Sequence, residues 1–231
     1  MMGLTTTETH MTIPHRILTL TAMLIFAGCG TTRSMYYNTW EKFGYAKRER
    51  LVDNVKAASA AQGEAKQQFA SALEEFRSVV NFSGGDLEAM YNKLNRSYET
   101  CEKRASAVND KIAAVKHVAN ALFSEWKGEI GEMKDDPSLK AQSQTLYDKT
   151  KHSYGDLAER MDSAAATMPP VLTKFHNRVL FIKHNLNAQA IASLKGTEIE
   201  IGGDIDKLIK EMEASIKQAD DFIAEIQPKK S

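Results

Sequence analysis

The side chains best suited to covalent or metal chemistry in this 231-residue chain are two cysteines, Cys29 and Cys101, and a few histidines. Neither cysteine lies in a Cys-x-x-Cys pair or beside a histidine at metal-ligand spacing, so the sequence predicts no zinc site. The histidines after residue 29 form no His-Glu-x-x-His pattern, and no Gly-x-Ser-x-Gly turn occurs. We therefore expect no catalytic site, no metal and no cofactor.

Cys29 directly follows an N-terminal apolar run. The run, Ile17 to Phe26, is too short to span a bilayer but suits the apolar region of a signal peptide. The tetrapeptide Phe26-Ala27-Gly28-Cys29 resembles the lipobox of bacterial lipoproteins, in which small residues precede a cysteine that is lipidated and becomes the new N-terminus. The alternative is an ordinary cleaved signal or a spurious N-terminal extension, with Met11 as a second candidate start.

The lipobox resemblance implies a signal peptide over residues 1–28 and an acyl anchor on Cys29, which holds the protein on membrane lipid. The next residue is Gly30 rather than Asp, which by the same resemblance implies the outer membrane, with the protein facing the periplasm. Residues 29–35 are then the lipidated cysteine and a short tether. Tyr36 and Trp40 begin an aromatic stretch that suits a membrane–water boundary, or else caps one end of a helical core.

Two long helices are predicted from apolar residues that recur in steps of four and three, the spacing of a coiled-coil seam. The second, Leu87 to Met133, contains no proline and would be about 70 Å long, so its partners must be long too. A break at 81–86 makes the two helices antiparallel neighbours. The seams run through Leu51, Val55, Ala58, Gln62, Ala65, Phe69, Ala72, Phe76 and Val79, and through Leu87, Tyr91, Leu94, Tyr98, Cys101, Ala105, Val108, Ile112, Val115, Ala119, Leu122, Trp126, Glu129 and Met133.

A third helix is predicted to start at Asp136-Pro137 and to meet Pro169-Pro170, where the seam slips from Met168 to Leu172 and runs on to Leu186. It is either one kinked helix or two helices that share an axis. A last helix follows from Ile201. We predict an all-α, elongated antiparallel bundle of three to four long coiled-coil-like helices over residues 36–227, with a flexible tail at 228–231.

Charge points to a possible contact surface in the third helix. Overall the chain balances 30 basic against 30 acidic residues, which argues against nucleic-acid binding. Between residues 163 and 197 there is no acid. Helical periodicity places Lys174 and Arg178 on one side of the apolar stripe and Lys183 and His176 on the other. Leu180 and Phe181 lie off the stripe. This pattern fits helix packing, a second copy of the chain, or an anionic lipid surface.

The sequence as a whole resembles a family of proteobacterial lipoproteins known only by a domain-of-unknown-function label. The resemblance rests on the lipobox, the stretch 37–50 with Trp40-Glu41 and Lys47-Arg48, the stretch 69–80 and the helix 87–126. A looser, fold-level analogy is to the membrane-sculpting BAR domains. We expect a non-enzymatic envelope lipoprotein with a structural or membrane-shaping role and self-association. The alternative is an adaptor that docks a periplasmic protein near Leu180 and Phe181.

Overall fold

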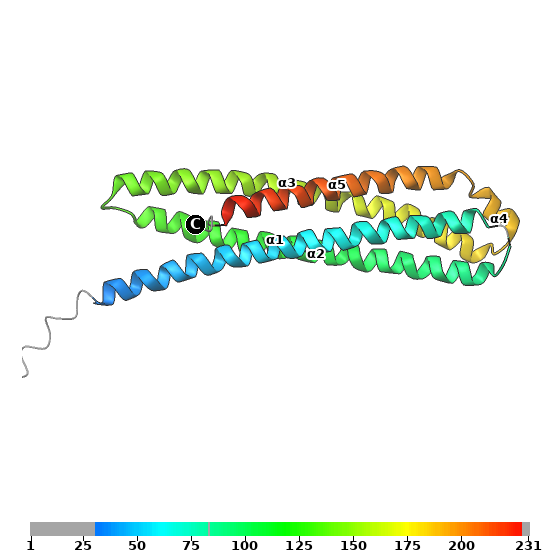
Figure 1. The fold of residues 1–231 in the computed structure, drawn as a ribbon, viewed down its shortest axis with the longest axis horizontal. Helices are drawn as coiled ribbons and strands as arrows, with labels where there is room; N and C mark the ends of the chain where they lie inside the picture. Colours follow the sequence, from blue (N-terminus) through cyan, green and yellow to red (C-terminus); the bar gives the residue numbers. More distant parts are fainter. Residues whose placement is uncertain (1–30, 83, 228–231) are drawn as a thin grey trace, which may run out of the picture. The chain divides into compact units, whose positions relative to one another are not determined.

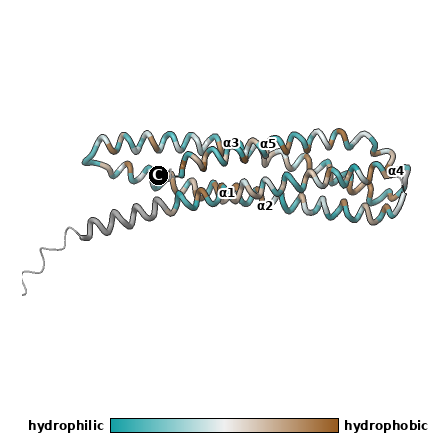
Figure 2. The backbone as a smooth tube through the Cα atoms, in the orientation of Figure 1, coloured by the Kyte–Doolittle hydropathy of each residue, from teal (hydrophilic) through white to brown (hydrophobic). Residues whose placement is uncertain are grey.

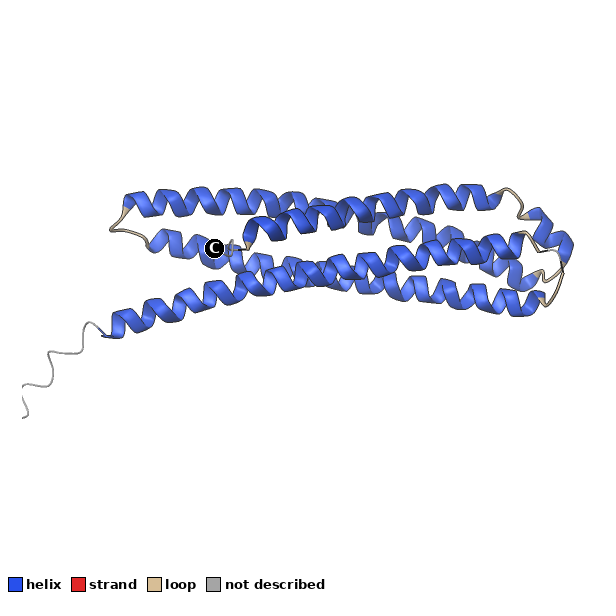
Figure 3. Ribbon diagram, viewed as in Figure 1, coloured by secondary structure: helices blue, strands red, loops and turns tan. Residues whose placement is uncertain are grey.

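The computed structural model describes residues 31–82 and 84–227, and all of the regular structure in them is helical (Figure 3). The chain forms two units, residues 1–43 and 44–231, and the first helix crosses their boundary. The helices are α1 (Thr31–Val80), α2 (Leu87–Glu132), α3 (Pro137–His184), the short α4 (Ala188–Ser193) and α5 (Thr197–Ile226).

Within the second unit, the four long helices pack as an antiparallel bundle (Figure 1). Ion pairs fix the direction of α1 against α2, because Lys47 pairs with Glu125 while Glu75 pairs with Lys93 much nearer the start of α2. Lys66 of α1 lies 3.1 Å from Glu213 of α5, and Arg77, further along α1, lies beside Gly202 near the start of α5, so these two helices are antiparallel too. The predicted fold class, an all-α bundle of long antiparallel helices, is confirmed.

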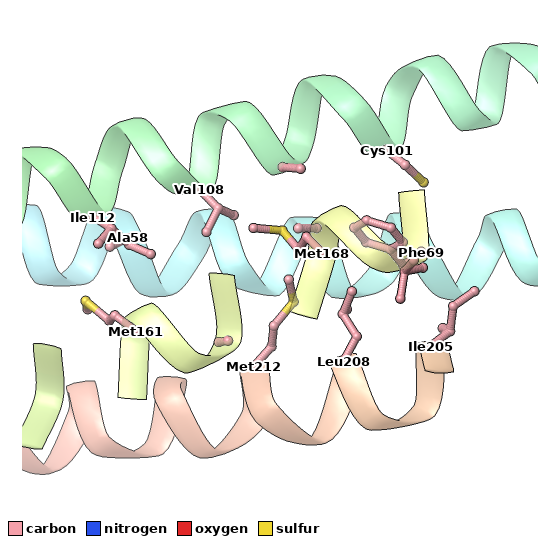
Figure 4. Close-up of a cluster of buried hydrophobic side chains, with 14 of the residues drawn as sticks. Ala58, Phe69, Cys101, Val108, Ile112, Met161, Met168, Ile205, Leu208 and Met212 are labelled. Atoms are coloured by element: carbon pink, nitrogen blue, oxygen red, sulfur yellow. The ribbon is translucent and has the colours of Figure 1, made fainter. Parts of the chain in front are cut away.

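The core of the bundle is the set of seams that the sequence predicts. Every predicted seam position of α1 from Leu51 to Val79 is buried, and so is the α2 seam from Leu94 to Leu122. Hydrophobic and hydrophilic residues alternate along the helices, as amphipathic packing requires (Figure 2). In the middle of the core, Val108, Met168 and Met212 come together from α2, α3 and α5 (Figure 4). Near the end of the bundle where α1 turns into α2, Phe76 of α1 meets Phe175 of α3 edge to face, with ring centroids 6.0 Å apart.

The starts of α2 and α3 follow from their capping residues. The Asp86 carboxylate accepts a hydrogen bond from the backbone N–H of Ala89 at 2.9 Å. Asp136 does the same for Ser138 and Leu139, and Pro137 occupies the first turn, where a missing N–H costs nothing. Gly84 and Gly85 precede Asp86 with φ of 139° and 116°, a backbone region that glycine alone enters without strain.

The helix α3 continues unbroken through Pro169 and Pro170, so the interpretation as two separate helices is wrong. A kink at the prolines stays a prediction of the sequence. The predicted slip at Leu172 is misplaced: Val171 is buried at 3% exposure, whereas Leu172 is only partly buried. The buried series therefore runs Met168, Val171, Phe175, Val179, Ile182, and its extra step of four falls after Phe175.

The ends of the elements differ from the sequence prediction in three places. Leu186 is exposed rather than in the seam, because α3 ends at His184 and the chain turns at Asn185. Met133 is exposed just beyond the end of α2. Trp126 near the end of α2, and Leu87 and Tyr91 at its start, are only partly buried. The helix α1 already begins at Thr31, inside the segment predicted to be a tether.

Candidate functional site

The predicted anchor and its aromatic neighbours belong to the first unit. Cys29 lies outside the described residues, so its lipidation stays a prediction. Tyr36 and Trp40 lie within α1, and their side chains are likewise outside the described part of the chain. The rest of the candidate site lies in the bundle of the second unit.

The basic residues of α3 meet acids that come from α5. Lys174 Nζ lies 2.7 Å from Asp204 Oδ2 and 2.8 Å from Glu200 Oε1. These hydrogen bonds, first to Asp204 and then to Glu200, raise the pKa of the Lys174 ammonium. Arg178 Nη2 lies 3.9 Å from Glu200 Oε2. The acid-free stretch of sequence is therefore not an acid-free surface, because α5 supplies the compensating charge.

The opposite flank of α3 faces α2. The ring of His176 packs against that of Tyr98, with centroids 5.1 Å apart. Lys183 is exposed, one helical turn beyond Val179 in the core. The two flanks expected from helical periodicity are therefore separate in the structure, and the ion-paired one with Lys174 and Arg178 faces α5.

Apolar side chains gather at the end of the bundle where α3 turns into α5. Leu180 and Phe181 are each 38% exposed, as their off-seam positions predict. Leu186, after the end of α3, and Ile199, in the first turn of α5, are also exposed. We call Leu180, Phe181, Leu186 and Ile199 the distal apolar group. The structure brings these residues to one end, whereas the sequence analysis singled out only the first two.

A second group of exposed apolar residues, which the sequence analysis missed, lies at the opposite end. It consists of Met133, Leu139 and Leu146, which flank the turn between α2 and α3. We call these three residues the hairpin-tip group. The available signal was the same as for Leu180 and Phe181, because Leu139 and Leu146 also lie off the seam that passes through Tyr147 and Thr150.

Cys101 is a buried residue of the α2 seam, as the sequence predicts. Its thiol is free and fully buried, and burial raises its pKa to about 12. A thiol that stays protonated at neutral pH is a poor nucleophile. Cys101 therefore contributes packing rather than chemistry in this arrangement.

The described residues contain no cluster of three or more His, Cys, Asp or Glu side chains arranged to hold a metal ion. In the same part of the chain, no helix combines the length and the hydrophobicity needed to cross a bilayer. Of the titratable groups described above, Lys174 and Arg178 are in ion pairs at the bundle surface, Lys183 is exposed, and the Cys101 thiol is buried.

The geometry defines a class of protein, a bundle of long antiparallel helices with apolar groups exposed at both ends. A family model described as "Protein of unknown function (DUF2959)" matches residues 36–226, which includes the whole described bundle. The chain therefore belongs to the DUF2959 family. Comparison with curated proteins finds no match.

Proposed function

We propose that this chain is a lipid-anchored, non-catalytic lipoprotein of the bacterial outer membrane that faces the periplasm and works as a structural spacer. The lipobox resemblance at Phe26 to Cys29 supports the anchor. The layered core of the bundle supports a mechanical role, because long close-packed helices hold their two ends at a fixed separation.

The observation that carries this proposal is the position of the distal apolar group relative to the point where the chain enters the bundle. The chain enters the second unit at Gly44, and Lys47 pairs with Glu125 near the end of α2. Phe76 is level with Phe175, so Phe181 lies some 35 residues of helix beyond Lys47. At 1.5 Å per residue, the distal group is roughly 50 Å from the entry point.

That separation favours a protein partner over lipid as the occupant of the distal group. A bundle tethered through Gly44 would hold Leu180 and Phe181 away from the bilayer unless it lay flat on it. Lys174, which an anionic lipid surface would attract, already has two carboxylate partners. The second candidate function is therefore an adaptor that presents the distal apolar group to a periplasmic protein or to another copy of this chain.

Membrane shaping, by analogy with BAR domains, is a more specific version of the proposed structural role. It requires copies of the anchored bundle to associate on one bilayer, so that their fixed length imposes a curvature. Reconstituted lipidated protein should then turn round vesicles into tubules, whereas a monomeric spacer would leave them round.

The anchor is tested by growing cells with labelled palmitate. The label should attach to the wild-type protein and be lost in Cys29→Ser. The matched control is Cys101→Ser, which removes the other cysteine and should keep the label. Label that persists in Cys29→Ser would refute the anchor and with it the proposed location.

The adaptor function is tested with a photo-crosslinking amino acid at position 181 in living cells. The control position is 159, which is exposed on the same helix midway along the bundle. A discrete product from position 181 alone, identified by mass spectrometry, would support a partner at the distal group. Equal yields from both positions would contradict a specific docking surface there.

A further inference from the structure

We propose that the hairpin-tip group is a second membrane contact, through which Leu139 and Leu146, with Met133, enter the interfacial region of the bilayer that holds Cys29. This inference rests on the proposed function, because it takes the lipid anchor as given. It concerns a different part of the chain from the basic stretch 163–197 and does not depend on anionic lipid.

The two leucines of the hairpin-tip group are more than half exposed. Leu139 is 56% and Leu146 is 57% exposed, and Met133 is 36% exposed. Leu139 and Leu146 are seven residues apart, which places them two turns apart on the same side of α3. Two leucines that share one side of a helix and stay in water are a surface that a partner can cover.

The leucines are uncovered because α5 is shorter than α3. Lys149 Nζ lies 3.1 Å from Glu225 Oε1, so the end of α5 at Ile226 is level with about residue 149 of α3. The stretch of α3 before that level, which carries both leucines, extends past the end of α5. The bundle leaves this flank of α3 without a described helix beside it.

The group also lies at the end where the chain enters the bundle from the anchor. Close to Lys47 and its partner Glu125, the guanidinium of Arg48 stands 5.8 Å from the centre of the Trp126 ring. Trp126 Nε1 in turn donates a hydrogen bond to Ser143 Oγ at 3.1 Å. Leu139 lies one turn before Ser143 and Leu146 one turn after it. The leucines therefore flank the layer through which α1 enters.

The remaining distance to the anchor is short. Residues 31–43 are helical, and 13 helical residues span only about 20 Å. Lipidated Cys29 would thus keep the entry end of the bundle near the membrane surface, whatever angle the two units adopt. The tip leucines are exposed apolar side chains at the end of the described bundle that such an anchor would hold near lipid.

The charge around the tip indicates the kind of contact. Residues 133–146 contain two lysines, Lys134 and Lys140, and two acids, Asp135 and Asp136, so their formal charges cancel. A segment without net charge gains little from anionic headgroups, whereas leucines gain from the boundary between headgroups and acyl chains. We therefore expect shallow apolar insertion that does not depend on salt.

The test uses the full-length protein, lipidated in cells and reconstituted into vesicles of phosphatidylethanolamine and phosphatidylglycerol. Leu139→Cys or Leu146→Cys carries an environment-sensitive nitrobenzoxadiazole label, and Glu159→Cys, exposed midway along α3, is the matched control. Cys101 is buried and will not compete for the label. We expect labels at 139 and 146 to shift their emission to shorter wavelength and to be quenched by bromine-bearing lipids, at low and high salt, and the label at 159 to do neither.

The other outcomes overturn the proposal in distinguishable ways. If the protein sediments with vesicles while the labels at 139 and 146 stay in water, the tip contact is wrong and the anchor stands. If the protein does not sediment with vesicles, the anchor and the tip contact are both wrong. A blue shift without quenching by brominated lipid, together with the mass of a dimer, would show that a second copy covers the tip.

Discussion

The most instructive perturbation of the bundle is Gln62→Leu. Gln62 occupies a seam position of α1, is fully buried, and neither atom of its side-chain amide has a hydrogen-bond partner among the described residues. Lys66 pairs with Glu213, and α1 and α5 are antiparallel, so Gln62 is level with the region of Ser215. Ser215 is also fully buried, with an unpartnered hydroxyl in the described bundle.

The expected magnitude follows from the groups involved. Burying an amide without its hydrogen bonds costs about 1–3 kcal/mol, and glutamine loses roughly 1 kcal/mol more side-chain entropy than leucine. The helix propensities of the two residues are nearly equal, so the backbone contributes little. Gln62→Leu should therefore raise the free energy of unfolding by about 2–4 kcal/mol. For a chain of this size, each kcal/mol raises Tm by about 2–4 °C.

Chemical and thermal unfolding, followed by circular dichroism, measure this change. The matched control is Gln67→Leu, an exposed glutamine on the same helix, which should stay within about 0.5 kcal/mol of wild type. A double-mutant cycle with Ser215→Ala completes the test. If Gln62→Leu destabilises the bundle, or if the cycle shows coupling above about 0.5 kcal/mol, the two side chains share a hydrogen-bonded arrangement and our reasoning is refuted.

Three further predictions concern single side chains. Val108→Asp places an unpaired charge at a fully buried position and should lower the free energy of unfolding by about 3 kcal/mol or more. The control Asn109→Asp changes an exposed residue and should not lower it in this way. An unchanged Tm for Val108→Asp would show that this seam is not buried. Burial, with repulsion from Glu125, raises the pKa of Glu129 above 4.5, so the folded state loses stability as pH rises past that value. Glu129→Gln should raise Tm at neutral pH, with the gain vanishing below pH 4.5; a gain that persists in acid would contradict this cause. Cys101 should resist maleimide in the folded protein and react in urea, and rapid labelling without denaturant would show that the α2 seam opens.

The middle of the bundle was predictable from the sequence because its determinants are local. The steps of four and three from Leu51 to Val79 specify one apolar face of a helix. That face is buried regardless of which long helix packs against it. Even Gln62, polar in an apolar series, is buried as its position requires. The position of the phase change in α3 was harder, because Val171 and Leu172 are adjacent apolar residues and only packing decides between them.

The charges and the helix ends were not predictable in the same way. The charge on Lys174 is compensated by Glu200 and Asp204, which are 26 and 30 residues later and reach it only because α5 folds back along α3. Met133 and Leu186 are exposed because α2 ends at Glu132 and α3 at His184, and the periodicity of a seam does not encode where a helix ends. The off-seam rule that identified Leu180 and Phe181 applied equally to Leu139 and Leu146 and, used throughout, would have found both ends.

Unequal helix lengths explain why the exposed apolar residues lie where they do. The helices α2 and α3 contain 46 and 48 residues, whereas α5 contains 30, so α5 is too short to cover α2 and α3 along their full length. The turn from α3 through α4 into α5 takes up the difference at one end, and the stop of α5 at Ile226 leaves the rest at the other. Packing within the bundle does not require leucines in the part of α3 that extends past α5, because polar residues there would have a similar helix propensity and would make the protein more soluble. Leu139 and Leu146 therefore point to a contact outside the bundle, and they lie at the end where α1 enters from the segment that carries the proposed anchor.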